Sequence, residues 1–262
     1  MSFASLQFAF FLPVVLIVYF VVPPAKRWFA LLVASLYCYA APAPLFLLYL
    51  VGLSLGGWLF GRVLERQELP RRRRLALGCA LVAAFAPLAL FKYFGFMNRE
   101  LGRLLSLEAA PLIPGLEFVL PVGISFHTFQ VAGYLIDVYR RTRPAEQHIG
   151  VFVLFVSFFP QLAAGPIERS THLLNEVADL RRPERAKTFD FDARRVAGGL
   201  RLVLWGFLKK LVIADNLALL VDEVYSAPLE YSGVALLLAT YCFAYQIYCD
   251  FSGYSDIARG LT

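Results

Sequence analysis

Charged residues are scarce in this sequence, and their scarcity defines its class. Only 17% of the 262 residues are charged, whereas 59% are hydrophobic, and the mean hydropathy is +0.64. This composition departs strongly from that of a soluble domain. It predicts an all-α, polytopic membrane protein. The net charge of +6 lies mostly in short loops between apolar segments, so we expect no nucleic-acid partner.

Cysteine and histidine are also sparse, which argues against a metal centre. The four cysteines, Cys38, Cys79, Cys242 and Cys249, all lie inside apolar runs, with no CxxC pair and no nearby histidine at ligand spacing. We interpret them as small buried side chains, with lipid modification of Cys38 or Cys79 as the alternative. The sequence also lacks a nucleophile elbow and a phosphate-binding loop. We therefore predict no metal site and no covalently bound cofactor.

No basic residue precedes the first apolar run, residues 8–22, whereas Lys26 and Arg27 follow it. A secretory signal peptide has the opposite order of charge. The run is thus predicted to be a first transmembrane helix, with the N-terminus outside the cell membrane.

Seven further apolar runs follow, at residues 28–40, 45–60, 75–94, 118–138, 151–164, 196–214 and 234–249. Because a span takes about 20 residues, the run at residues 28–40 is marginal, and we expect seven or eight membrane-embedded segments. The arginines of residues 62–74 and 140–143 predict cytoplasmic loops. Anionic-lipid binding and nucleic-acid binding are the other interpretations of the run at residues 71–74.

One apolar run is predicted to enter the membrane and return. Residues 151–164 are few and end in a stretch with two prolines and a glycine, Phe158 to Pro166. A full crossing would place residues 169–195, with seven basic residues, outside the cell. A re-entrant segment keeps them in the cytoplasm and leaves the next loop, the acidic residues 215–231, outside. Irregular backbone at membrane depth has to be buried in protein or line a cavity.

Polar side chains interrupt the last apolar segment. At helical spacing, Gln246 and Asp250 share one face, whereas Ser252 and Asp256 lie on a neighbouring face near the helix end. A carboxylate at membrane depth indicates a functional site. The structural alternative is that Asp256 pairs locally with Arg259 and that Asp250 completes a buried hydrogen-bond network.

His127 is the one histidine inside an apolar run. It could act as a general base if a cavity reached it. The alternative is a hydrogen bond to a neighbouring helix. His148 and His172 lie in or beside predicted cytoplasmic loops and are interpreted as solvated side chains.

Four ordered blocks resemble the membrane-bound O-acyltransferases, and most closely their alginate O-acetylase branch. The blocks are residues 121–140, which contain Pro121-Val-Gly-Ile-Ser-Phe126, then 159–169, 206–215 and 248–258. Within the blocks lie Gln161, Gly165, Pro166, Asp250, Ser252, Tyr254 and Asp256. With the resemblance in view, we interpret these residues, together with Gln246, as cavity-lining or motif residues. The N-terminal third matches mainly in its hydropathy.

The resemblance implies a bacterial inner-membrane acetyltransferase whose helices form a ring around a funnel. Acetyl groups would come from a cytoplasmic donor, acetyl-CoA, for O-acetylation of an exported polysaccharide such as alginate. Membrane lipid, the polysaccharide and periplasmic acetyl-carrier proteins are the implied partners.

The family's catalytic histidine comes in a Trp-rich stretch further along, whereas this sequence stops at Thr262. We therefore expect a single transmembrane domain that is incomplete at its C-terminus, with N-terminal helices in 1–117 and the motif region in 118–262. We also expect it to be inactive alone. A non-catalytic membrane subunit, a decayed paralogue and a transporter are the alternatives.

Overall fold

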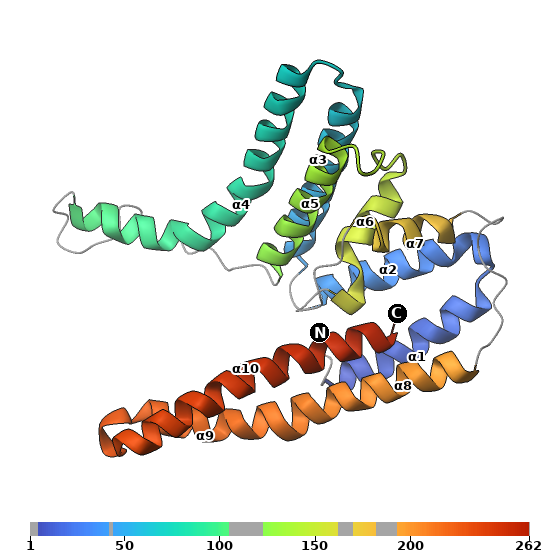
Figure 1. The fold of residues 1–262 in the computed structure, drawn as a ribbon. Coiled ribbons are helices and arrows are strands. Elements are labelled where there is room, and N and C mark those ends of the chain that lie inside the picture. Colours follow the sequence, from blue (N-terminus) through green and yellow to red (C-terminus); the bar gives the residue numbers. More distant parts are fainter. Residues whose placement is uncertain (1–4, 42–43, 105–122, 162–169, 182–192, 262) are drawn as a thin grey trace. The chain divides into compact units, whose positions relative to one another are not determined.

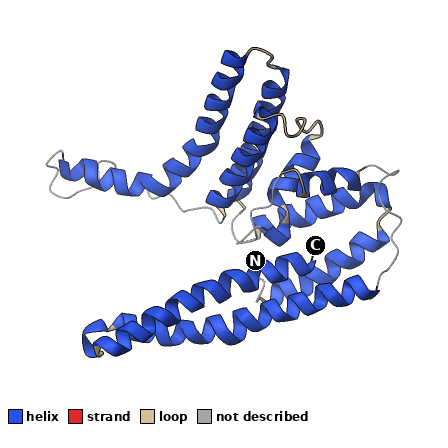
Figure 2. Ribbon diagram, viewed as in Figure 1, coloured by secondary structure: helices blue, strands red, loops and turns tan. Residues whose placement is uncertain are grey.

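The computed structural model describes residues 5–41, 44–104, 123–161, 170–181 and 193–261. Every regular element in these ranges is a helix (Figure 2), so the predicted all-α class is confirmed. The chain divides into two compact units, which we describe separately. Unit 1 comprises Met1–Val18, Pro160–Pro166 and Lys187–Thr262, and unit 2 comprises Tyr19–Phe159 and Ile167–Ala186. The single transmembrane domain stays a prediction.

Three helices are long and apolar enough to cross a membrane among the residues described: α3 (Phe46–Arg66), residues Pro70–Asn98 of α4 (Pro70–Leu104), and α10 (Gly233–Leu261). The helix α1 (Leu6–Val21) and the segment Ile149–Gln161 are apolar but shorter. The chain is thus an all-α membrane protein. The expected number of seven or eight membrane-embedded segments stays a prediction.

Unit 2 is built on α3, α4 and α5 (Ile124–Tyr139), which pack against one another (Figure 1). Two glycines of α3 make room for side chains of α5. A Cβ atom on Gly61 would lie 2.5 Å from the hydroxyl of Tyr134, and one on Gly57 would lie 2.6 Å from a methyl group of Val131. Because these positions lack side chains, the fully buried Tyr134 can occupy the surface of α3.

The rest of unit 2 surrounds this core. After η1 (Pro24–Lys26), α2 (Arg27–Ala40) packs against α6 (Ile149–Ser157), and α7 (Leu173–Leu180) packs against α6 (Figure 1). The buried Leu173, Leu174 and Val177 form the apolar face of α7.

The segment predicted to be re-entrant ends its helix early. α6 has 9 residues, about 14 Å of helix, against a hydrocarbon core of about 30 Å. Phe158 leaves the helical conformation, and η2 (Phe159–Gln161) follows. The backbone N–H of Phe159 donates to the Ser35 hydroxyl at 3.2 Å, so α2 satisfies this irregular backbone. The short helix supports re-entrance, which stays a prediction because residues 162–169 lie outside the described ranges.

Unit 1 contains a helical hairpin. α8 (Ala193–Phe207), η3 (Leu208–Ala214) and α9 (Asp215–Ser226) follow one another, and α10 returns alongside them after η4 (Pro228–Glu230) (Figure 1). Residues 215–231 were expected to form a loop, which is wrong for most of their length. They continue as α9 because Val221 and Val224 bury their side chains and α9 packs on α10.

Candidate functional site

The backbones of α8 and α10 approach each other closely at two levels. A Cβ atom on Gly206 would lie 2.5 Å from the carbonyl oxygen of Gly253, and one on Gly199 would lie 2.6 Å from that of Gly260. On each helix the two glycines are seven residues apart, about two turns, so they recur on the same face. Small residues of this kind allow close packing of membrane helices. The glycines bring the polar residues of α10 within reach of the hairpin's other arm.

The helix that continues from α8 widens where it meets the polar part of α10. η3 is a π-helix over Leu208–Ala214, a rare geometry that is frequent at functional sites. It contains two consecutive lysines, Lys209 and Lys210. Gly253 lies against both, because a Cβ atom there would be 3.2 Å from Lys209 Cβ and 3.2 Å from the backbone nitrogen of Lys210. The π-helix therefore passes α10 at Gly253, between Asp250 and Asp256.

Lys209 binds the side of α10 nearer its C-terminus. Its Nζ donates to Asp256 Oδ2 at 2.6 Å and to Ser252 Oγ at 2.9 Å. The side chains of Lys209 and Asp256 are only 16% and 14% exposed. The Nζ also lies 5.8 Å from the centre of the Trp205 ring, within the range of a cation–π interaction. This lysine is enclosed by charged, polar and aromatic partners at once.

Lys210 binds two further carboxylates. Its Nζ lies 2.6 Å from Asp250 Oδ1 and 2.9 Å from Asp215 Oδ1. These side chains are more open, with 32% of Lys210 and 54% of Asp250 exposed. Consecutive lysines thus hold carboxylates on both sides of Gly253. The lysines and aspartates form what we call the Lys–Asp cluster, consisting of Lys209, Lys210, Asp215, Asp250 and Asp256.

The cluster can hold charge at membrane depth at lower cost than isolated ions could, since each lysine has a carboxylate within hydrogen-bond distance. It offers hydrogen-bond donors and acceptors where η3 meets α10. Within the described ranges, no group of three His, Cys, Asp or Glu side chains could hold a metal ion. The arrangement suits binding and orientation of polar groups.

The other sequence-predicted site residues have different surroundings. Gln246 lies on α10 one turn before Asp250, and its buried Oε1 has no hydrogen-bond partner among the described residues. Gln161 of η2 is 5% exposed, and its Oε1 likewise has no partner there. Tyr254 is half-buried on α10. Gly165 and Pro166 lie outside the described residues.

His127 lies on α5 with no exposed surface. Its ring packs edge-on against the rings of Tyr39 and Phe126, at centroid distances of 5.6 and 5.8 Å. Such enclosure favours a packing role over that of a general base. His148 accepts a hydrogen bond from the backbone N–H of Val151 at its Nδ1, so it is the N-cap of α6 rather than a freely solvated side chain.

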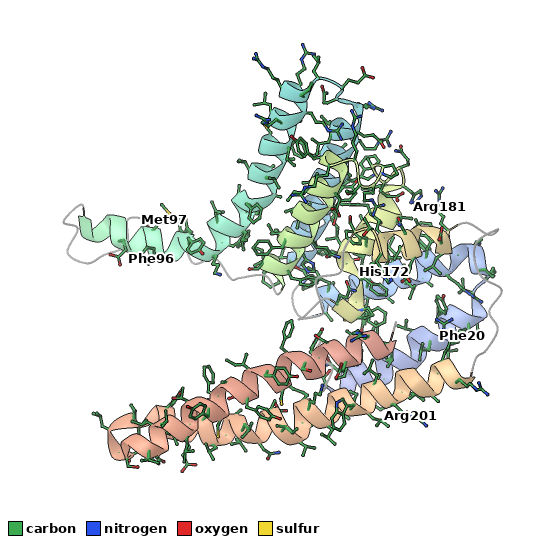
Figure 3. The ribbon with its side chains drawn as sticks, in the orientation of Figure 1. Phe20, Phe96, Met97, His172, Arg181 and Arg201 are labelled. Atoms are coloured by element: carbon green, nitrogen blue, oxygen red, sulfur yellow. The ribbon has the colours of Figure 1, made fainter. Side chains whose placement is uncertain are left out.

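His172, labelled in Figure 3, comes just before α7 and lies 3.8 Å from Glu176. Both side chains are about two-thirds exposed, at 67% and 65%. This exposure agrees with the interpretation of His172 as a solvated side chain.

A separate polar network in unit 2 fixes the loop after α5. The Arg143 guanidinium donates to the carbonyl of Ser170, and the Ser170 hydroxyl donates to Asp137 at 2.5 Å. Burial lowers the pKa of Arg143, while Tyr134 and the nearby carboxylates of Glu146 and Asp137 oppose the shift. The network joins the loop to the start of α7 and serves to hold unit 2 together.

Sequence reasoning missed Lys209 and Lys210 as site residues. Both were present in the third motif block, but only the acidic and amide side chains of α10 were singled out. The signal was available, because two lysines inside the apolar run 196–214 are as costly in lipid as a carboxylate.

Comparison with known proteins identifies the family. The chain is 36% identical over its whole length to the probable alginate O-acetylase of Pseudomonas aeruginosa, covering 49% of that protein. That of Pseudomonas putida is 35% identical over the whole chain and 52% of its own length. This chain belongs to the membrane-bound O-acyltransferases, in their alginate O-acetylase-like branch.

Another relative in this family is the peptidoglycan O-acetyltransferase of Helicobacter pylori, 29% identical over 96% of the chain and 51% of that protein. The chain spans about half the length of the curated relatives it matches. No protein-family model matches the chain. The Lys–Asp cluster connects two of the blocks by which the sequence resembles membrane-bound O-acyltransferases, residues 206–215 and 248–258.

Proposed function

We propose that this chain is part of a membrane O-acetyltransferase that modifies an exported polysaccharide. The relatives named as O-acetylases match it along its whole length, which supports the reaction class. The observation that carries the proposal is the Lys–Asp cluster. It joins residues of two motif blocks that are far apart in sequence, with Lys209 and Asp256 separated by 47 positions.

The reaction would take an acetyl group from acetyl-CoA in the cytoplasm to a hydroxyl of a polysaccharide such as alginate. The enzyme would lie in the bacterial inner membrane with its N-terminus outside, among membrane lipids, and pass acetyl groups to the polysaccharide or to a periplasmic acetyl carrier. The Lys–Asp cluster would brace the helices that line the acetyl path. Its role would be positioning, since its lysines are already paired with carboxylates.

The base that deprotonates the acceptor hydroxyl would not be His127. A ring with no exposed surface gives an acceptor no access, and general-base catalysis requires the base within hydrogen-bond reach of the proton. Residues 1–262 expressed alone are expected to transfer no acetyl group, because none of their three histidines matches the catalytic histidine that the family resemblance implies. Transfer by this polypeptide that His127→Ala abolishes would overturn this part of the proposal.

The test uses the native gene in a strain whose exported polysaccharide is O-acetylated. Deleting the gene should remove the O-acetyl signals from the polysaccharide in NMR spectra, and restoring the wild-type gene should bring them back. Asp256→Asn should restore little acetylation, because it removes the carboxylate that pairs with Lys209. Unchanged acetylation after deletion would refute the proposed function.

Two controls accompany this test. The amount of each variant in isolated membranes, measured by immunoblot, separates loss of activity from loss of protein. Asp222→Asn is the matched control, because it removes one carboxylate from α9 outside the Lys–Asp cluster. It should restore acetylation fully.

A further inference from the structure

The four arginines at the start of α4 have two different surroundings. Arg73 is only 8% exposed, and its guanidinium donates to the carbonyl of Val138 at 2.8 Å. Arg71, Arg72 and Arg74 are exposed, and they have no ion-pair or hydrogen-bond partner among the residues that the structure describes. Arg73 therefore stabilises the fold, whereas the other three guanidinium groups are available to a ligand.

An apolar groove runs between α3 and α4. It has a volume of about 640 Å³, within the range of small-molecule sites. Small residues keep it open, and Gly52, Gly56 and Ala83 are among those that line it. A Cβ atom added to Gly52 or to Gly56 would meet nothing within 4 Å. These glycines are therefore not needed for close helix packing, unlike Gly57 and Gly61 of the same helix.

A second hollow continues along α4 towards its arginines. Its lining includes Arg71, Arg74, Gly78 and Ala83, and Ala83 also lines the first groove. Arg72 does not line it. Ala83 lies about 14 Å along the helix from Arg74, which matches half of a hydrocarbon core of about 30 Å. The guanidinium groups of Arg71 and Arg74 thus lie at one end of an apolar path, and the length of this path matches the thickness of one membrane leaflet.

We infer that this path binds an anionic phospholipid, with its phosphate on Arg71 and Arg74 and an acyl chain in the groove between α3 and α4. The charge complementarity is local. Guanidinium groups bind phosphate through paired hydrogen bonds, and the first turn of α4 contains no acidic residue. The apolar lining beyond the arginines suits a hydrocarbon chain, whereas a nucleotide or coenzyme would need polar partners there.

Native mass spectrometry of the complete gene product, purified in detergent, tests this inference. The probes are phosphatidylglycerol and phosphatidylcholine with identical acyl chains. We expect the wild-type protein to retain phosphatidylglycerol preferentially. Since a hydrogen bond to a charged group contributes about 1.5–3 kcal/mol, Arg71→Gln/Arg74→Gln should weaken phosphatidylglycerol binding by about 100-fold or more. Arg72→Gln is the matched control and should weaken binding by no more than about 5-fold, because it removes only the general attraction of one basic residue near the membrane surface.

A second pair of variants tests the apolar part of the site without changing charge. Gly78→Leu should reduce phosphatidylglycerol binding, because Gly78 lines the hollow and its Cβ position is open. Gly133→Leu is the control, since this position on α5 is also open and exposed but does not line the groove. Equal losses of phosphatidylglycerol binding in Arg72→Gln and in Arg71→Gln/Arg74→Gln would overturn the inference. So would equal retention of both lipids, or displacement of phosphatidylglycerol by inorganic phosphate or free coenzyme A.

Discussion

Breaking the Lys209 ion pair should cost far more stability than breaking the neighbouring Lys210 pairs. Lys209 and Asp256 are 16% and 14% exposed and lie 2.6 Å apart, so Lys209→Met leaves Asp256 largely buried without its cation. Breaking a buried pair in this way costs about 3–5 kcal/mol. Lys210 and Asp250 are 32% and 54% exposed. Exposed pairs contribute about 0–1 kcal/mol, so Lys210→Met should cost much less.

The assay is a double-mutant cycle on the complete protein in detergent micelles or bilayers. Unfolding free energies would be compared for the wild type, Lys209→Met, Asp256→Asn and the double variant. The double variant should recover part of the loss, because it leaves no unpaired charge. We expect a coupling energy of about 1–3 kcal/mol. Additive effects, or equal losses for Lys209→Met and Lys210→Met, would refute the reasoning.

Three further predictions concern positions with distinct local causes. Gly206→Ala should destabilise the hairpin by about 1–3 kcal/mol in thermal unfolding, because its Cβ would lie 2.5 Å from a backbone oxygen, whereas Gly198→Ala, with open space, should be harmless. Asp250→Ala should lower acetyl transfer less than Asp256→Ala, because Lys210 keeps Asp215; equal losses would contradict this. Burial lowers the pKa of His148 from 6.5, helped by the charge of Arg181 and opposed by that of Glu146. The stability that this N-cap provides is therefore complete above pH 6.5 and is lost as the pH falls through the folded-state pKa. His148→Asn should abolish this pH dependence in melting curves at pH 5–8.

Hydropathy alone was enough to find most helices of this protein. The run at residues 28–40 is α2 to within one residue, the run at 45–60 begins one residue before α3, and the run at 75–94 lies within α4. Long apolar segments in a membrane form helices, because a helix makes its backbone hydrogen bonds within the segment. Their ends were less predictable. The acidic residues 215–231 looked like a loop, but packing against α10 extends them as α9.

The polar residues of α10 were recognisable from sequence because polar groups in an apolar run require partners. The sequence did not reveal which partners these polar residues have. Asp256 could have paired with Arg259 three residues away, at ordinary helical spacing. In the structure it binds Lys209, which is 47 positions distant, because Gly206 and Gly253 let two backbones meet and a π-helix lies at the crossing.

The sequence by itself determined the class of this protein, its family and the positions where charged residues interrupt its apolar segments. These depend on composition and on local order along the chain. Only the tertiary structure decided how that charge is neutralised, since the pairing joins helices brought together by long-range packing. It also separated Arg73, which is bound to the carbonyl of Val138, from Arg71 and Arg74. Four identical side chains in a row differ only in the direction that each takes from the helix.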